Sequence, residues 1–346
     1  MRQTRTVKTG LLFAILSAVM AALFLTSLLI GPVSIPVKDI LVILTGGEPA
    51  RPEWAVIITD LRLPRAVTAL VAGMALSVSG LQMQTVFRNP LAGPYVLGIS
   101  GGASLGVAIV VMGFSFIGGT AVAMPGNWPV VIAAWAGSGL VLFLLLLVSF
   151  RVRDIMTILI LGILFGSATT AVVSVIQYFS TESMLKSFMI WTMGSLGGVT
   201  RQQLSIMIPA VGAGLLLSLA SVKLLNILLL GENYARSLGV NVTGARLLLF
   251  LSTSILAGTV TAFCGPIAFV GIAVPHLARI IFRNANHAVM VPATILSGSV
   301  VMLLSDILTS LPGFSGTLPV NSITALLGIP VIIWIVIRNQ KLTGIF

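Results

Sequence analysis

Charged residues are scarce in this chain. Only 8% of the 346 residues are charged, whereas 57% are hydrophobic. Soluble domains carry about 25% charged residues, so the composition excludes an ordinary soluble domain and predicts a protein embedded in a membrane. There is a single cysteine, Cys264, which excludes an internal disulfide and any metal site built from several thiolates. The net charge of +11 is scattered over the connecting loops, so no nucleic-acid partner is predicted.

Energy-coupling and cofactor motifs are also missing. None of the five lysines follows a glycine, so the phosphate-binding loop that ends in Gly-Lys-Ser/Thr is absent. No His-Glu-x-x-His motif is present, and neither a metal nor another cofactor is predicted. Acidic residues inside the apolar runs are rare, and the main exception, Asp306, is more typical of a paired helix-end residue than of a proton relay. A partner must therefore supply the energy for any transport.

Apolar runs of about 20 residues fill most of the sequence. Such runs are long enough to cross a hydrocarbon core of roughly 30 Å as helices, and lipid offers backbone groups no partners outside a helix or a closed barrel. We therefore expect an all-α, polytopic membrane protein that forms one transmembrane domain over residues 1–346. About ten crossings are predicted, at residues 11–30, 64–86, 92–112, 128–149, 155–178, 203–222, 244–264, 267–281, 288–310 and 320–337.

The basic residues indicate the orientation of these crossings. Cytoplasmic loops carry an excess of Lys and Arg. With the amino end inside, 13 of the 19 basic residues fall on the cytoplasmic side, and the other six are Lys38, Arg51, Arg62, Arg65, Lys186 and Arg201. Both termini are thus expected in the cytoplasm. The turn-rich segment of about residues 31–63 is expected outside, with a short amphipathic helix near Val37–Leu44.

Three stretches carry a family resemblance. Residues 60–65 read Asp-Leu-Arg-Leu-Pro-Arg, and a Gly- and Ala-rich run then leads to a proline-broken hinge at residues 84–102. Residues 231–239 read Gly-Glu-Asn-Tyr-Ala-Arg-Ser-Leu-Gly, and residues 265–276 read Gly-Pro-Ile-Ala-Phe-Val-Gly-Ile-Ala-Val-Pro-His. In this order the stretches resemble the FecCD-type family of permease subunits, from ABC importers for iron–siderophore, haem and cobalamin. The resemblance covers nearly the whole chain.

The resemblance implies an assembly and a location. The permease would work as a homodimer in the bacterial cytoplasmic (inner) membrane, surrounded by lipid. Two ATP-binding cassette subunits would hydrolyse the ATP, and a periplasmic or lipoprotein substrate-binding protein would deliver the cargo, which the sequence does not identify. Helices two to five and seven to ten would form an inverted repeat. A trace of such a repeat is present at an offset of 185, which pairs Ala72-Gly73 with Ala257-Gly258, Gly80 with Gly265, and Pro90 with Pro275.

Two arginines are expected to face the delivery protein. Arg62 and Arg65 flank Pro64 at the expected start of the second crossing, where cations oppose the helix macrodipole and so call for a reason. Snorkelling is the plainer interpretation. The resemblance implies instead that Arg62 and Arg65 meet carboxylates of the substrate-binding protein.

The loop of about residues 223–246 is expected to contact the ATPase. Gly231 and Gly239 bracket a short predicted helix with Glu232 in its first turn and Arg236 further along, while Tyr234, Ala235 and Leu238 would form a small apolar face. A helix lying on the membrane surface is the plainer alternative. The resemblance implies that this helix is the coupling element for the ATPase.

Small residues mark a candidate pathway along the fifth crossing. Gly162 and Gly166 are followed by Thr169 and Thr170, a pattern that also suits ordinary helix packing. The resemblance implies that this helix borders the pathway at the dimer axis.

Two other classes of function remain open on sequence grounds. One is a self-contained, ion-coupled secondary carrier, whose uptake would not depend on a separate ATPase. The other is an intramembrane serine protease, because Gly98-Ile-Ser-Gly101 could supply a nucleophile and His276 or His287 a base. Loss of activity on changing Ser100 would favour the protease, whereas the same small residues also suit close helix packing.

Overall fold

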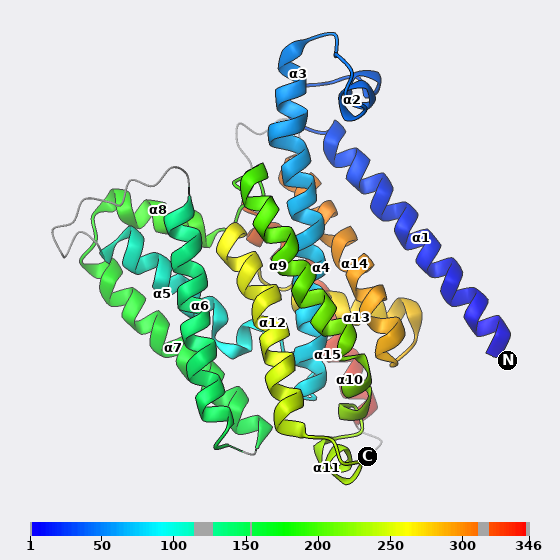
Figure 1. The fold of residues 1–346 in the computed structure, drawn as a ribbon, viewed down its shortest axis with the longest axis vertical. Coiled ribbons are helices and arrows are strands. Elements are labelled where there is room, and N and C mark those ends of the chain that lie inside the picture. Colours follow the sequence, from blue (N-terminus) through cyan, green and yellow to red (C-terminus); the bar gives the residue numbers. More distant parts are fainter. Residues whose placement is uncertain (1, 114–126, 153, 311–317, 344–346) are drawn as a thin grey trace.

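The protein is a bundle of helices in the computed structural model, which describes residues 2–113, 127–152, 154–310 and 318–343 (Figure 1). These ranges contain no strand. The elements in chain order are α1 (Arg2–Leu29), α2 (Val37–Leu44), α3 (Pro52–Val56), η1 (Ile57–Arg62), α4 (Leu63–Val86), η2 (Pro94–Leu97), α5 (Ile99–Val111), α6 (Trp128–Ser149), α7 (Ile155–Tyr178), α8 (Glu182–Thr192), α9 (Arg201–Ala220), α10 (Val222–Leu228), α11 (Glu232–Ser237), α12 (Val242–Cys264), α13 (Val270–Phe282), α14 (His287–Thr309) and α15 (Val320–Thr343).

The helices that can cross a membrane match the predicted crossings in order. In the described ranges, seven are long and apolar enough by themselves: α1, the continuous helix Pro52–Val86, α6, α7, α9, α12 and α14. Three shorter apolar helices, α5, α13 and the Val320–Ile335 part of α15, occupy the remaining predicted positions. The all-α, polytopic fold is confirmed, and α2 coincides with the predicted amphipathic helix.

The second crossing begins earlier than predicted. A helix starts at Pro52, passes through the π-helical turn η1 and continues as α4, giving 35 residues to Val86. Pro64 was expected to begin the helix, but it lies in the first turn of α4 after the wider π turn, where its missing N–H is tolerated. Arg62 therefore lies within a continuous helix, and the expectation that it opposes the macrodipole at a free helix start is wrong.

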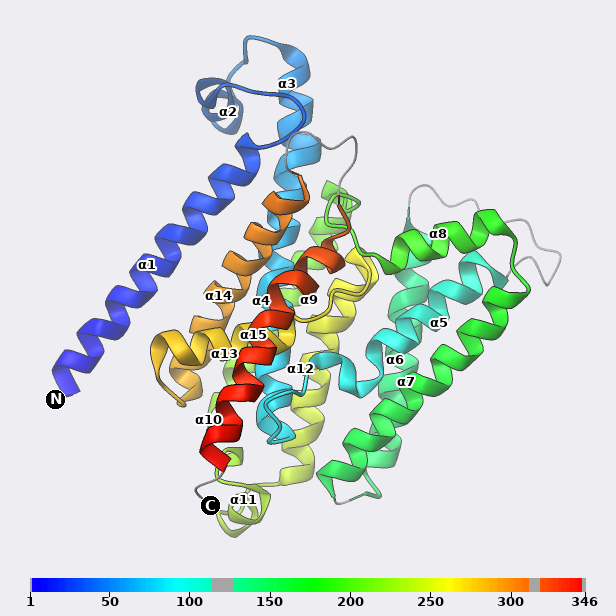
Figure 2. The same cartoon turned by 180° about the vertical axis from the view of Figure 1, so that it is seen from behind.

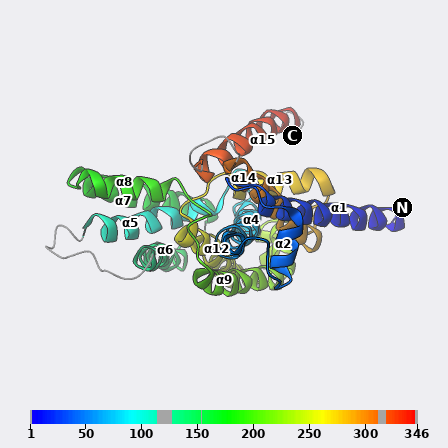
Figure 3. The same ribbon diagram turned by 90° about the horizontal axis from the view of Figure 1, so that it is seen from above.

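The centre of the molecule is formed by α4 and α12. Figure 3 shows these two helices between a group made of α5, α6, α7 and α8 and a second group that includes α1, α13 and α14. Small residues in α4 allow the backbones of neighbouring helices to cross it closely. A Cβ at Gly73 would overlap the carbonyl of Gly298 in α14, and one at Gly80 would overlap that of Gly271 in α13.

The two halves of the chain repeat the same series of helices. The lengths of α4 and α12 are 24 and 23 residues, those of α6 and α14 are 22 and 23, and α5 and α13 both have 13. Helix α4 runs away from the end that carries α2, whereas α12 runs towards it (Figure 1). The residue register predicted from the sequence is wrong, because Gly80 lies inside α4 while Gly265 caps the end of α12.

Both halves contain a broken crossing. At about 1.5 Å per residue, 13 residues span only about 20 Å, less than the hydrocarbon core. Helix α5 is preceded by a first break, residues 87–98, which contains η2, and α13 is preceded by a second break, residues 265–269. The predicted continuous crossings at 92–112 and 267–281 are thus each part helix and part irregular chain. Figure 2 shows α5 and α13 on opposite sides of α12.

Candidate functional site

Helix α11 is a short helix set off by a left-handed glycine at each end. Gly231 precedes it at φ 102° and Gly239 follows it at φ 77°, a region that favours glycine. At the carboxyl end, Val240 N donates to Ala235 O and Gly239 N to Arg236 O, both at 3.0 Å, which is the Schellman arrangement. The predicted helix after Gly231 and stop at Gly239 are confirmed.

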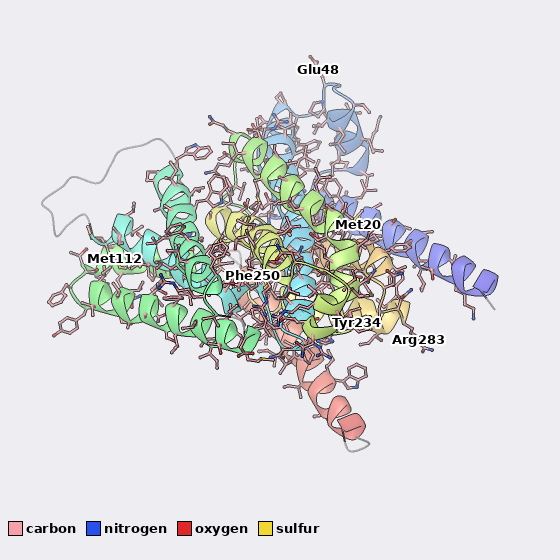
Figure 4. All side chains as sticks on the ribbon, turned by 60° about the horizontal axis from the view of Figure 1, so that its bottom comes forward. Met20, Glu48, Met112, Tyr234, Phe250 and Arg283 are labelled. Atoms are coloured by element: carbon pink, nitrogen blue, oxygen red, sulfur yellow. The ribbon has the colours of Figure 1, made fainter. Side chains whose placement is uncertain are left out.

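The apolar face of α11 is smaller than predicted. Ala235 is fully buried and packs with the core residues Leu225, Leu228 and Val242. Tyr234 and Leu238 are 50% and 55% exposed and, four residues apart, share one face. Figure 4 shows Tyr234 at the end of the molecule that is turned forward. The expectation that Ala235 shares an outer face with Tyr234 and Leu238 is therefore wrong, because Ala235 seats the helix on the bundle.

A buried ion pair fixes α11 to α12. Arg246, in the second turn of α12, is buried and donates from Nε to Glu232 Oε1 at 2.8 Å and from Nη2 to Glu232 Oε2. Arg236 approaches the same carboxylate at 3.7 Å but is about half exposed. A two-point Arg–carboxylate pair restricts orientation as well as distance. Arg246 is not among the residues predicted for this site from the sequence, although a basic residue at the start of an apolar helix is a usable signal.

At the opposite end, Arg62 is an internal connector. Its side chain is buried, and Nη1 donates to the carbonyls of Leu28 at 2.8 Å and Leu29 at 3.1 Å, while Nη2 donates to Val33 O. These carbonyls belong to the carboxyl end of α1 and the segment after it, where a cation complements the helix dipole. The Arg62 guanidinium is tightly packed, because a Cβ added at Gly31 would come within 2.8 Å of it.

Arg65 joins the start of α4 to the end of α14, at the end of the molecule that carries α2. Its Nε lies 2.6 Å from Asp306 Oδ1, and its Nη2 donates to Thr309 Oγ1 at 2.6 Å. The Arg65 side chain remains 21% exposed and that of Asp306 only 5%. Asp306 is thus a paired residue at the end of a helix, as the sequence favours. Direct docking of a delivery protein by Arg62 and Arg65 remains a prediction, and the exposed fraction favours Arg65.

Three of the four predicted pathway residues, Gly162, Gly166 and Thr170, border an open groove between α7 and the first break. The groove has a volume of about 690 Å³, and its wall includes Tyr95, Gly98, Gly162, Gly166 and Thr170. Gly162 also permits close packing, because a Cβ there would overlap the carbonyl oxygen of Val96. Thr169 is buried against Gly101 and is not part of the wall.

The side chains needed for the protease alternative are engaged elsewhere. His276 Nε2 donates to Pro90 O at 2.7 Å. The ring nitrogens of His287 lie 2.9 Å from Thr85 Oγ1 and 3.0 Å from Asn226 Oδ1. The small residues around Ser100 serve packing instead, since Cβ atoms at Gly102 and Gly106 would overlap the backbone of α6. Among the described residues, no three His, Cys, Asp or Glu side chains gather as a metal site would require.

Two matched sets of crossing helices with broken segments at the centre and a fixed surface helix at one end characterise a transporter permease. The chain belongs to the FecCD transport family, which its residues 19–338 match. It is accordingly a multi-spanning inner-membrane permease of the ABC importer class rather than an enzyme.

Curated relatives and solved structures are similar to this protein over most of its length. The vitamin B12 import system permease protein BtuC of Citrobacter koseri is 35% identical over 283 residues, covering 82% of this chain and 83% of the relative. BtuC of Klebsiella pneumoniae is 36% identical over 309 residues, covering 87% and 90%. A structure described as the inward-facing conformation of a metal-chelate type ABC transporter has a TM-score of 0.82 at 29% identity and covers 95% of this chain and 99% of that one. PsaBC from Streptococcus pneumoniae in complex with Fab, at a TM-score of 0.51 and 18% identity over 78% of this chain and 88% of that one, shares the fold.

Proposed function

We propose that this chain is the translocating subunit of an importer for a cobalamin-, haem- or iron–siderophore-type cargo. It would act as a homodimer with two ATP-binding cassette subunits and a substrate-binding protein on the outer side. The BtuC relatives favour cobalamin within this range of cargoes. Both termini would be cytoplasmic, in keeping with the start of α1 and the end of α15, which lie towards the end that carries α11 (Figure 1).

The observation that carries the proposal is the rigid seating of α11. A six-residue helix has little stability of its own in water, yet this one is held by two left-handed glycines, the buried Ala235 and the Glu232–Arg246 pair. It directs Tyr234 and Leu238 outwards. A rigid helix with an apolar outer face can transmit force from a partner to α12, which runs through the centre of the bundle.

The groove beside α7 is the proposed cargo pathway. The described residues of its wall are glycines, hydroxyl residues and apolar side chains, and none of them is charged. A wall of this kind provides no strong fixed site, which suits a route in which another protein selects the cargo. The exposed apolar residues of α7, including Ile163 and Leu164, would face the second copy in the homodimer.

The experiment that tests the proposal is Leu238→Asp in the full assembly. A charge in an apolar contact that becomes buried costs about 2–4 kcal/mol, so we expect co-purification of the ATPase subunit and vesicle uptake to fall together. Tyr234→Ala should act in the same direction and more mildly. Membrane insertion should be unchanged, since neither side chain packs inside the bundle.

Leu41→Asp provides the matched control. Leu41 is 54% exposed, as Leu238 is at 55%, but it lies on α2 at the opposite end of the molecule. Leu41→Asp should leave co-purification of the ATPase subunit intact. Full co-purification and uptake in Leu238→Asp would show that α11 is not the coupling element, and uptake that needs no ATPase would favour a secondary carrier.

A further inference from the structure

The two broken crossings lie against each other at the centre of the molecule. The first break (residues 87–98) and the second break (residues 265–269) belong to corresponding positions of the two halves. The first break packs against the first turn of α13, directly after the second break, because a Cβ at Gly271 would come within 2.7 Å of Pro94 Cδ, and one at Gly93 within 2.9 Å of Ile272 Cγ1. Irregular chain at membrane depth needs partners for its backbone groups, and each break obtains such a partner from the other half.

One hydroxyl group satisfies both backbone groups of a residue in the second break. Tyr95, in η2 of the first break, donates from its hydroxyl to Ile267 O at 2.8 Å and accepts from Ile267 N at 3.1 Å. Ile267 is fully buried. Loss of the Tyr95 hydroxyl would leave a buried N–H and a buried carbonyl without this partner, which is more costly than the absence of an exposed hydrogen bond.

A second contact links the same two regions, with the side chain now supplied by the second half of the chain. His276, in the helix that follows the second break, donates from Nε2 to Pro90 O in the first break at 2.7 Å. Gln84 adds a bond to Ile272 O at 3.0 Å and accepts from Arg279 at 2.7 Å. Each half thus holds the irregular segment of the other.

The second break is held in a strained conformation. Phe269 has φ 68°, which is costly for a bulky residue and persists only where the surroundings enforce it. Phe269 packs closely against Gly328 of α15: a Cβ added at Gly328 would come within 2.6 Å of Phe269 Cβ. Asn321, also in α15, accepts from Ala268 N at 3.0 Å. A strained segment fixed by a few polar contacts is suited to switch between two arrangements.

Tyr95 also contributes to the wall of the groove beside Gly162 and Gly166. One face of this side chain therefore borders the proposed pathway, while its hydroxyl group holds the second break. That break continues into α13 and bonds to α15 through Asn321. A change at the groove that moves Tyr95 must release Ile267.

We propose that Tyr95 and His276 are positioning residues of the transport cycle: they clasp the two breaks together, and release of Ile267 by Tyr95 accompanies the change between transport conformations. The transport part of this inference rests on the proposed function. The clasp itself is a property of the isolated chain and can be tested without an ATPase or a cargo.

The single cysteine of the chain supplies the readout. Cys264 immediately precedes the second break, is 3% exposed, and accepts at its carbonyl from Ser195 N at 2.8 Å. A small methanethiosulfonate reagent should modify its thiol only when this region opens. In purified chain in nanodiscs, Tyr95→Phe should raise the modification rate of Cys264 roughly tenfold or more, because it removes two bonds to buried groups while it keeps the ring.

Two further variants make the test specific. Tyr178→Phe removes a hydroxyl from an exposed tyrosine at the end of α7 and should leave the rate at the wild-type value. His276→Leu should raise the rate, and His276→Gln, which keeps a side-chain N–H, should restore much of the protection. A wild-type rate in folded, monodisperse Tyr95→Phe would overturn the clasp.

If Tyr95→Phe does not fold, the same modification of Cys264 in the wild-type chain tests the clasp. In the assembled complex, the modification rate of Cys264 should differ at least severalfold between the nucleotide-free state and ATP turnover. Equal rates in these states would refute a clasp that opens during transport. A failure of the proposed function would appear separately, as absence of the ATPase subunit from the complex or of ATP-dependent uptake.

Discussion

At the scale of single residues, several of the few charged side chains form internal connections. Arg62 binds carbonyls at the end of α1, Arg65 binds Asp306, and Arg246 binds Glu232. A charge removed from water is tolerated only when it is paired and hydrogen-bonded. Position and burial, rather than residue type, therefore separate connectors from surface residues such as Arg236.

Glu232→Gln should show this difference in α11. The substitution keeps the shape of the side chain but removes the charge that pairs with the buried Arg246 at two points, and breaking a buried pair typically costs about 3–5 kcal/mol. We expect a clear fall in the thermal midpoint in detergent and weaker ATPase co-purification. Arg236→Ala is the control, because an exposed partner contributes only about 0–1 kcal/mol. Equal effects of the two substitutions would contradict the role assigned to the buried pair.

At the scale of the elements, glycines decide how closely the helices cross. Gly80 of α4 meets the backbone of Gly271 in α13, whereas Gly212 of α9 has no atom within 4 Å of the position its Cβ would occupy. The same residue type is therefore indispensable in one helix and replaceable in another. Spacing in the sequence does not separate the two cases.

Gly80→Ala is expected to destabilise the protein strongly. Its methyl group would overlap a backbone carbonyl, so the crossing of α4 and α13 must widen, and overpacking in a core costs about 1–3 kcal/mol or more. Gly212→Ala should be neutral or stabilising by up to about 1 kcal/mol, since alanine is the better helix former. The measurement is thermal unfolding of both variants in one detergent. A loss of similar size in Gly212→Ala would mean that contacts outside the single chain, and not the α4–α13 crossing, set the requirement.

At the scale of the whole molecule, Arg65 and Asp306 join helices from the two halves across 241 residues of sequence. The pair lies at the end where a delivery protein is proposed to dock. Stability and docking can be separated, because a pair whose charges are exchanged still attracts internally but presents the opposite charge to a partner.

Arg65→Glu alone should destabilise the chain, because it places a second acid beside the buried Asp306. Arg65→Glu combined with Asp306→Arg should recover much of the thermal stability. If Arg65 meets carboxylates of the delivery protein, the recovered double variant should still bind that protein more weakly at low salt, where exposed charges are least screened. Wild-type affinity in a stable double variant would leave Arg65 as an internal connector only.

The sequence by itself determined the class of the protein, because low charge and apolar runs of membrane length leave few alternatives to crossing helices. It also located α2 and α11, whose boundaries follow from local signals such as Gly231 and Gly239. Local patterns could not give the partners of Arg62, the burial of Ala235 or the start of the second crossing at Pro52. Those features, and the contact of Tyr95 with Ile267 across 172 residues, depend on which helices pack together. Only the tertiary structure decided them, because a hydrogen bond or a backbone crossing joins residues by distance in space and leaves no period in the sequence.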